Sequence, residues 1–157
     1  MTIITESLIR TQLRYVNIAW CKLTSGSLND LSLFIRGNNK LEKLLLQHNC
    51  LTDAYQNKHF FNALCENISL KYLDLSANNM QADNLKVLLD LQSRDKLKLE
   101  NLQYRKNKVD GHELHSCFRK LQLNNKLRVL NLQDNFITNE NAEEIREFWA
   151  EKNIFAE

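Results

Sequence analysis

His112 and His115 come closest to a metal-binding pattern in this sequence, in the segment that runs from Gly111 to His115. Zinc-binding helices of the HExxH type carry their histidines four residues apart, so that both imidazoles lie on one face of the helix. Here the two histidines are three residues apart, and no third ligand follows. We therefore interpret both as solvated helix residues and expect no metal site.

His48 and Cys50 are the other pair whose types could do chemistry, as a base and a nucleophile. Such a pair needs contact between the two side chains and a third group that orients the histidine. Their spacing places them on different sides of a bend in the chain, so we reject the pair. Glycine, at three residues, is also too scarce for a phosphate-binding loop, and neither GxGxxG nor GxxxxGK occurs. We expect no catalytic residues, no cofactor and no enzymatic activity.

Five copies of one sequence frame make up most of the chain, and they must position any binding residues. Each copy fits LxxLxLxx(N/C)x(L/M/V/I), with Val16, Ile18 and Tyr104 as substitutions. The copies are spaced 28, 29, 29 and 28 residues apart, and they begin at Leu13, Leu41, Leu70, Leu99 and Leu127. A fixed period of this length predicts stacked units, none of which can bury its apolar side alone.

Within each copy, positions four and six are apolar and alternate with polar neighbours, which predicts a short, half-buried β-strand. Leu44 and Leu46 therefore point inward together, as do Leu73 and Leu75. Position nine is cysteine in the first copy and asparagine in the other four. We expect a buried side chain there to satisfy backbone groups where the strand bends away.

The remainder of each copy predicts a helix with apolar residues at helical spacing, such as Leu85, Leu88 and Leu89. Four residues are predicted to cap these helices: Asp53, Asp83, Asp110 and Asn139. Asparagine-rich segments at 37–40, 67–69 and 124–126 return the chain to the next strand, and we expect left-handed backbone there.

The period, the N/C position and the Asn-x-x-Leu junction together resemble the ribonuclease-inhibitor-like class of leucine-rich repeats. The resemblance covers roughly residues 13–152. It implies an α/β leucine-rich repeat solenoid, a horseshoe arc of about five repeats with a concave parallel sheet and convex helices. We expect one domain over residues 1–157, with an N-terminal capping helix at 1–12, repeats at 13–138, and a final helix and C-terminal cap at 139–157.

The positions that alternate with the inward leucines predict a binding surface. Positions three, five and seven must face outward, and position eight lies at the rim of the sheet. The candidate partner-binding residues at these positions are Tyr15, Asn17, Trp20, Lys43, Leu45, Gln47, His48, Tyr72, Asp74, Asn101, Gln103, Arg105, Asn131 and Gln133. Tyrosine, tryptophan and arginine are the residue types that most often anchor protein interfaces, which favours Trp20, Tyr15, Tyr72 and Arg105 as anchors, together with an exposed Leu45.

Charge and hydropathy limit the kinds of partner. The net charge is +2, with 21 basic and 19 acidic residues, and positions two, three, five, seven and eight together carry six basic against four acidic side chains. That mixture indicates a protein partner and no nucleic acid. No apolar run is long enough to cross a membrane, and the first residues do not form a signal peptide, so we expect a cytoplasmic protein. The four cysteines lack CxxC spacing, which favours reduced thiols in or near the core.

These observations predict a non-catalytic protein–protein interaction module that is a monomer by itself and binds through its concave face. The resemblance implies an inhibitor or a scaffold, with the active site of a partner enzyme as one target. The absence of proline and the scarcity of glycine indicate an AT-rich genome, and a bacterial effector acting in the host cytosol or on another effector enzyme fits this composition. The alternatives are an actin-capping-like domain and a GTPase-regulating domain.

Overall fold

The structure is a computed structural model that describes residues 11–52, 55, 57–118, 126–150 and 155–156, with the backbone alone at 115–118, 148–149 and 155–156. Six parallel strands form one sheet in chain order within these residues. The strands are β1 (Tyr15–Asn17), β2 (Lys43–Leu45), β3 (Tyr72–Asp74), β4 (Asn101–Gln103), β5 (Val129–Asn131) and β6 (Phe155–Ala156). Parallel strands require a crossover between neighbours, and each repeat supplies one.

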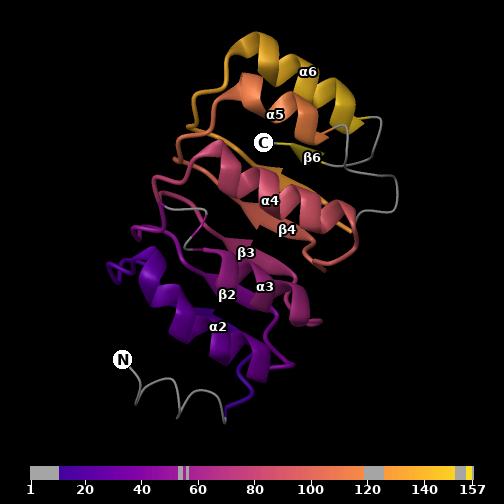
Figure 1. Cartoon of the computed structure of the whole chain (residues 1–157). Helices are drawn as coiled ribbons and strands as arrows, with labels where there is room; N and C mark the ends of the chain where they lie inside the picture. The colour runs from indigo at the N-terminus through magenta and orange to yellow at the C-terminus, as the bar shows by residue number, and fades with distance from the viewer. Residues whose placement is uncertain (1–10, 53–54, 56, 119–125, 151–154, 157) are drawn as a thin grey trace.

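The crossovers are helices that form a second layer against the sheet. They are α2 (Leu28–Gly37), α3 (Lys58–Glu66), α4 (Ala82–Ser93), α5 (Gly111–Phe118) and α6 (Asn139–Ala150), and the 3₁₀ turn η1 (Ser25–Ser27) precedes α2. Figure 1 shows the repeats stacked from indigo to yellow, with the helices on one side of the sheet. The predicted α/β leucine-rich repeat solenoid is therefore confirmed.

The strands pair in register, so that the same frame position of every copy lies in one row across the sheet. Leu44, Leu73, Leu102 and Leu130 pair in sequence at position four. Leu44, Leu46, Leu73 and Leu75 are all fully buried, as predicted. Tyr104 fills an inward position of the fourth copy, where its hydroxyl donates to the carbonyl of Gln81 at 3.3 Å.

The position-nine asparagines join each repeat to the next. Asn78 Nδ2 donates to the carbonyls of Leu46 and Leu75, both at 3.0 Å, and its Oδ1 accepts the amide of Asn49 at 3.1 Å. Asn107 repeats the pattern one step along the stack, with Asn78 N–H as its donor. A short amide side chain thus satisfies backbone groups of two neighbouring copies, as the sequence predicted.

Two of the four predicted helix-capping residues are wrong. Gln81 and Thr138 precede α4 and α6, so Asp83 and Asn139 lie inside their helices, whereas Asp110 accepts the amide of His112 as predicted. Asp53 lies outside the described residues.

The junction asparagines also differ from the prediction. Asn38 and Asn67 have φ of −105° and −84° and are not left-handed. Asn67 is placed there because its side chain binds the carbonyls of Ile35 and Asn38 in the preceding repeat.

The two ends of the solenoid are described unequally. The predicted N-terminal capping helix falls on residues 1–10, which lie outside the described part of the chain. At the other end, α6 is the predicted final helix, and the tail adds β6, with Phe155 paired to Val129. The predicted core location of the thiols is wrong for Cys21 and Cys50, which are exposed, and the described cysteines Cys21, Cys50 and Cys65 are all free thiols.

Candidate functional site

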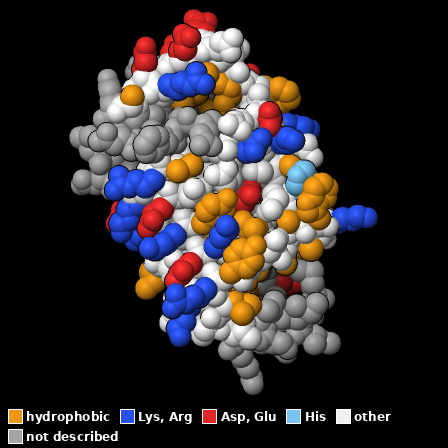
Figure 2. Space-filling view, turned by 180° about the vertical axis from the view of Figure 1, so that it is seen from behind, with side chains coloured by type: hydrophobic (Ala, Val, Ile, Leu, Met, Phe, Trp, Pro, Cys, Tyr) orange, Lys and Arg blue, Asp and Glu red, His pale blue; other side chains and the backbone are white. Residues whose placement is uncertain are grey.

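The candidate site is the sheet surface opposite the helices, together with its rim. In Figure 2, which is turned by 180° from Figure 1, hydrophobic and basic side chains lie interspersed on the side away from the helices. The sequence placed 14 candidate residues here, and the structure places 12 of them on the surface, half-buried or exposed. Leu45 and Asn131 are the exceptions, with only 9% and 4% of their surface exposed.

These two corrections have physical causes. Leu45 lies on β2 between Asn17 and Asp74 of the adjacent strands, and the longer Lys43 and Gln47 flank it along its own strand. Leu45 thus has polar side chains on all four sides, and an apolar residue in such surroundings loses most of its contact with water. Asn131 turns its side chain along its own backbone, where Oδ1 accepts the amide of Gln133 at 3.1 Å.

Position three places a lysine between two aromatic rings. The register aligns Tyr15, Lys43 and Tyr72 on β1, β2 and β3. Lys43 Nζ lies 4.2 Å from the centroid of the Tyr72 ring and 5.8 Å from that of Tyr15, which are cation–π distances. Partial burial raises the pKa of the Tyr72 hydroxyl, and the nearby Asp74 and Tyr15 raise it further, so this phenol stays protonated as a hydrogen-bond donor at neutral pH.

Position eight holds a second aromatic contact. The rings of Trp20 and His48 stack with centroids 3.7 Å apart and planes 10° apart. Trp20 is 71% exposed although it takes part in this stack. It presents a broad apolar surface, and burial of such a surface stabilises protein complexes.

The backbone at position eight is left-handed in every copy, which the sequence analysis did not predict. Its φ is between 51° and 61° at Trp20, His48, Ala77, Lys106 and Asp134. Such a conformation costs roughly 1–2 kcal/mol per non-glycine residue, so the fold must impose it. In the first four copies the position-eight amide donates to the position-seven carbonyl of the next copy, at 2.7–3.1 Å. This bond holds the rim side chains in one row.

Position five contributes less to the exposed surface than predicted. The carboxylate and amide oxygens of Asp74 and Asn17 accept the backbone amide two residues further on, at 2.9 and 3.0 Å. Asn131 does the same, so three of the five position-five side chains shape the bend after the strand. Local bonds of this kind are typical of Asn and Asp followed by a turn, and that signal was present in the sequence.

The fourth and fifth strands carry polar side chains that bind one another. Gln103 Nε2 donates to Asn101 Oδ1 at 2.8 Å, and Arg105 Nη2 lies 3.2 Å from Asp134 Oδ2. Arg105 Nε and Gln47 Oε1 are buried and have no hydrogen-bond partner within the described residues. Gln133 is exposed beside this group.

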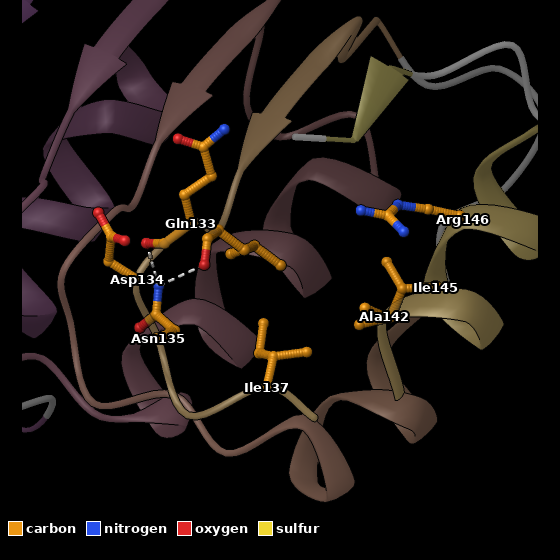
Figure 3. A pocket seen from close by; sticks show the side chains of 8 residues that line it. Gln133, Asp134, Asn135, Ile137, Ala142, Ile145 and Arg146 are labelled. Carbon is orange, nitrogen blue, oxygen red and sulfur yellow. Dashed lines mark hydrogen bonds between the residues drawn. The ribbon is translucent and has the colours of Figure 1, made fainter. Parts of the chain in front are cut away.

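A pocket at the last repeat is a further feature that the sequence analysis missed. It has a volume of about 180 Å³ and lies between the end of β5 and α6. Figure 3 shows Ile137, Ala142 and Ile145 around it, with Asn135 bonded to two carbonyls on its other side. Position eleven, occupied here by Ile137, is fully buried in the three preceding copies. The pocket depends on the spacing of two elements, so no sequence motif marks it.

The residues considered for catalysis are the two histidines of α5 and the pair His48 and Cys50. His112 is exposed on α5, and the side chain of His115 lies outside the described part of the structure. His48 stacks on Trp20, whereas Cys50 is exposed two residues further on and its amide donates to the carbonyl of Leu23.

Comparison with known proteins identifies the repeat. A leucine-rich repeat sequence model matches residues 66–88 and 123–145, which cover the same part of the third and fifth copies. No curated protein matches. Within the described residues, no helix combines the length and hydropathy that a membrane span requires.

Several solved structures are similar to this chain. A leucine-rich repeat protein of Leptospira interrogans is 19% identical with a TM-score of 0.48, and the match covers 82% of this chain and 27% of that one. The internalin inlF of Listeria monocytogenes is 17% identical with a TM-score of 0.45, covering 82% and 36%. Internalin C2 of the same species is 16% identical with a TM-score of 0.38, covering 86% and 84%. This chain therefore spans about a quarter to a third of the length of the first two.

Proposed function

We propose that this leucine-rich repeat protein binds another protein through the concave surface of its sheet. Leucine-rich repeat folds generally mediate protein–protein interaction, and stacking repeats creates the extended concave surface that they use. The observation that carries the proposal is the exposure of Trp20 and Tyr15, at 71% and 52%, on a surface that the sheet register fixes in place. The proposed partner is a protein, not a nucleic acid or a membrane. In the absence of that partner, we propose that the chain is a monomer.

The test is affinity capture from a lysate of the source organism with wild-type and variant protein. Trp20→Ala should lose a captured protein that the wild type retains, since truncating an anchor of this type weakens complexes by about 2 kcal/mol or more. Leu33→Ala, at an apolar residue of α2 that is 52% exposed, is the matched control and should capture normally. Equal capture by wild type and Trp20→Ala would contradict the proposal, as would loss with Leu33→Ala alone.

We propose a stoichiometric inhibitor or adaptor as the more specific role. The five repeat strands, β1 to β5, are spaced about 4.8 Å apart and make a platform of roughly 20 Å, a width that can cover the active-site cleft of an enzyme. If the captured protein is an enzyme, one equivalent of this chain should block its activity, and Trp20→Ala should not. An adaptor would leave that activity unchanged.

A cytoplasmic site of action, including the host cytosol for a bacterial effector, is also part of the proposal. Two exposed free thiols, Cys21 and Cys50, are compatible with a reducing compartment. Localisation of a tagged chain by microscopy tests this directly. A secreted, extracellular pool would contradict it.

The alternatives remain actin capping and GTPase regulation. A GTPase-regulating arginine must be available to a nucleotide; the Arg105 guanidinium is bound to Asp134, whereas Arg128 is exposed. Co-sedimentation with actin filaments and an assay of accelerated GTP hydrolysis would each reveal the corresponding alternative.

A further inference from the structure

The net positive charge of the sheet surface lies on a small number of side chains. Positions two to eight carry six basic side chains and four acidic ones: Arg14, Lys43, Lys71, Arg105, Lys106 and Arg128, against Glu42, Asp74, Glu100 and Asp134. Three ion pairs, Arg14–Glu42, Lys71–Glu100 and Arg105–Asp134, use three of each. Among the described residues, this leaves Lys43, Lys106, Arg128 and Asp74 without an ion pair, a surplus of positive charge.

Lys43 is the cation without an ion pair that lies between the rings of Tyr15 and Tyr72. The Tyr72 and Tyr15 rings on either side attract the ammonium, but they carry no net charge and do not neutralise it. An ammonium has three donors, and two ring faces leave capacity for an anionic acceptor. The remaining acid, Asp74, already accepts the backbone amide of Ser76 at 2.9 Å.

The stack of Trp20 and His48 supplies apolar area on the same surface, at position eight, five residues along the frame from the position of Lys43. The two rings stack face to face, so the uncovered part of the Trp20 indole, whose residue is 71% exposed, remains for a partner. A partner segment that fits both features needs a negatively charged group and, several residues along the same extended chain, an apolar one. A nucleic acid fits less well, because its affinity depends on neutralising many phosphates and the surplus here is small.

We propose that Lys43, held between Tyr15 and Tyr72, binds a carboxylate of an acidic, extended segment of the partner protein. An apolar side chain of the same segment packs on the Trp20–His48 stack. This inference rests on the proposed function and specifies the chemistry of the partner.

The test is selection of random twelve-residue peptides, displayed on phage, on the immobilised full chain. Selected sequences should be enriched in Asp or Glu, with an aliphatic or aromatic residue several positions away along the peptide. The consensus peptide should bind Lys43→Met about tenfold or more weakly than wild type, since a charge-assisted hydrogen bond is lost. Lys43→Arg keeps the charge and should restore most of the affinity. Lys58→Met, at the exposed first residue of α3, is the matched control and should bind like wild type.

Four outcomes would overturn the inference: a neutral or basic consensus, no selectable peptide, equal binding by Lys43→Met, and tighter binding of a single-stranded oligonucleotide than of the consensus peptide. Circular dichroism of each variant shows whether it is folded before its binding is compared. Loss of peptide binding in Trp20→Ala but not in Lys43→Met would leave the proposed function intact and refute the carboxylate site. Binding unaffected by either variant would refute both.

Discussion

The two halves of the concave surface share one backbone and differ in what their side chains do. In the aromatic half, formed by the first three repeats, Trp20 stacks on His48, and Lys43 lies over the rings of Tyr72 and Tyr15. Both Tyr15 and Trp20 remain largely exposed. In the amide half, on β4 and β5, the outward side chains are Asn101, Gln103, Arg105, Asn131 and Gln133, most of which form hydrogen bonds or ion pairs.

This difference indicates where binding energy can come from. A polar group that is already paired gains little from a partner, because the new bond replaces an old one. An exposed aromatic ring gains by losing contact with water. The same repeat frame therefore builds one half suited to anchoring a partner and one half whose amide side chains, together with Arg105, are occupied by their own contacts.

The largest expected effect is a loss of stability from substitutions in the apolar core, which lies under both halves. Leu73→Ala under the aromatic half and Leu102→Ala under the amide half should each destabilise the fold by about 2–5 kcal/mol, since both side chains are almost fully buried. Chemical denaturation measures both values. A small loss at one site alone would mean that the halves differ in packing as well as in surface.

Substitutions at the surface test whether the aromatic half contributes more binding energy than the amide half. Trp20→Ala should weaken binding to the captured partner about 30-fold, or about 2 kcal/mol, whereas Arg105→Ala should weaken it several-fold less because Arg105 is already paired. The melting temperature of each variant should stay near that of the wild type. Titration calorimetry gives the two affinities, and a larger loss for Arg105→Ala would reverse the assignment of the halves.

Alkaline pH should destabilise the protein through the inward tyrosine of the amide half. Burial raises the pKa of Tyr104 well above its ordinary value of 10.0. A raised pKa in the folded state means that stability is fully present below pH 10 and falls as the pH rises past it, because the unfolded chain ionises first.

Tyr104→Phe isolates this effect. It should cost about 0.5–1.5 kcal/mol at pH 8, through loss of the bond to Gln81, and the variant should lose less stability than wild type between pH 8 and 11. Denaturation midpoints at several pH values measure the difference. Parallel curves for the two proteins would show that the phenol ionises without unfolding.

The smallest effects are expected at the exposed ion pairs of both halves. Glu42→Gln removes the Arg14 pair, and Asp134→Asn removes the Arg105 pair. Each should change the free energy of unfolding by less than about 1 kcal/mol, because solvent screens exposed charges. Thermal melts at low and high salt would detect a larger, salt-sensitive contribution if one existed.

The sequence alone predicted the features that depend on period and parity. The five-copy frame gave the strand positions, the buried Leu44 and Leu73, and the asparagines that link neighbouring repeats. It did not predict features that depend on neighbours in space. The burial of Leu45 requires knowledge of the residues beside it on adjacent strands, and the stack of Trp20 on His48 requires the left-handed rim that hydrogen bonds between copies impose.

Photo-crosslinking tests most directly whether a partner docks on the aromatic half. A benzoylphenylalanine in place of Tyr15, and the same group in place of Leu33 on α2, are irradiated with the source-organism lysate. We predict a crosslinked protein at position 15 and none at position 33. A crosslink at position 33 without one at position 15 would place the partner on the helices and contradict the account.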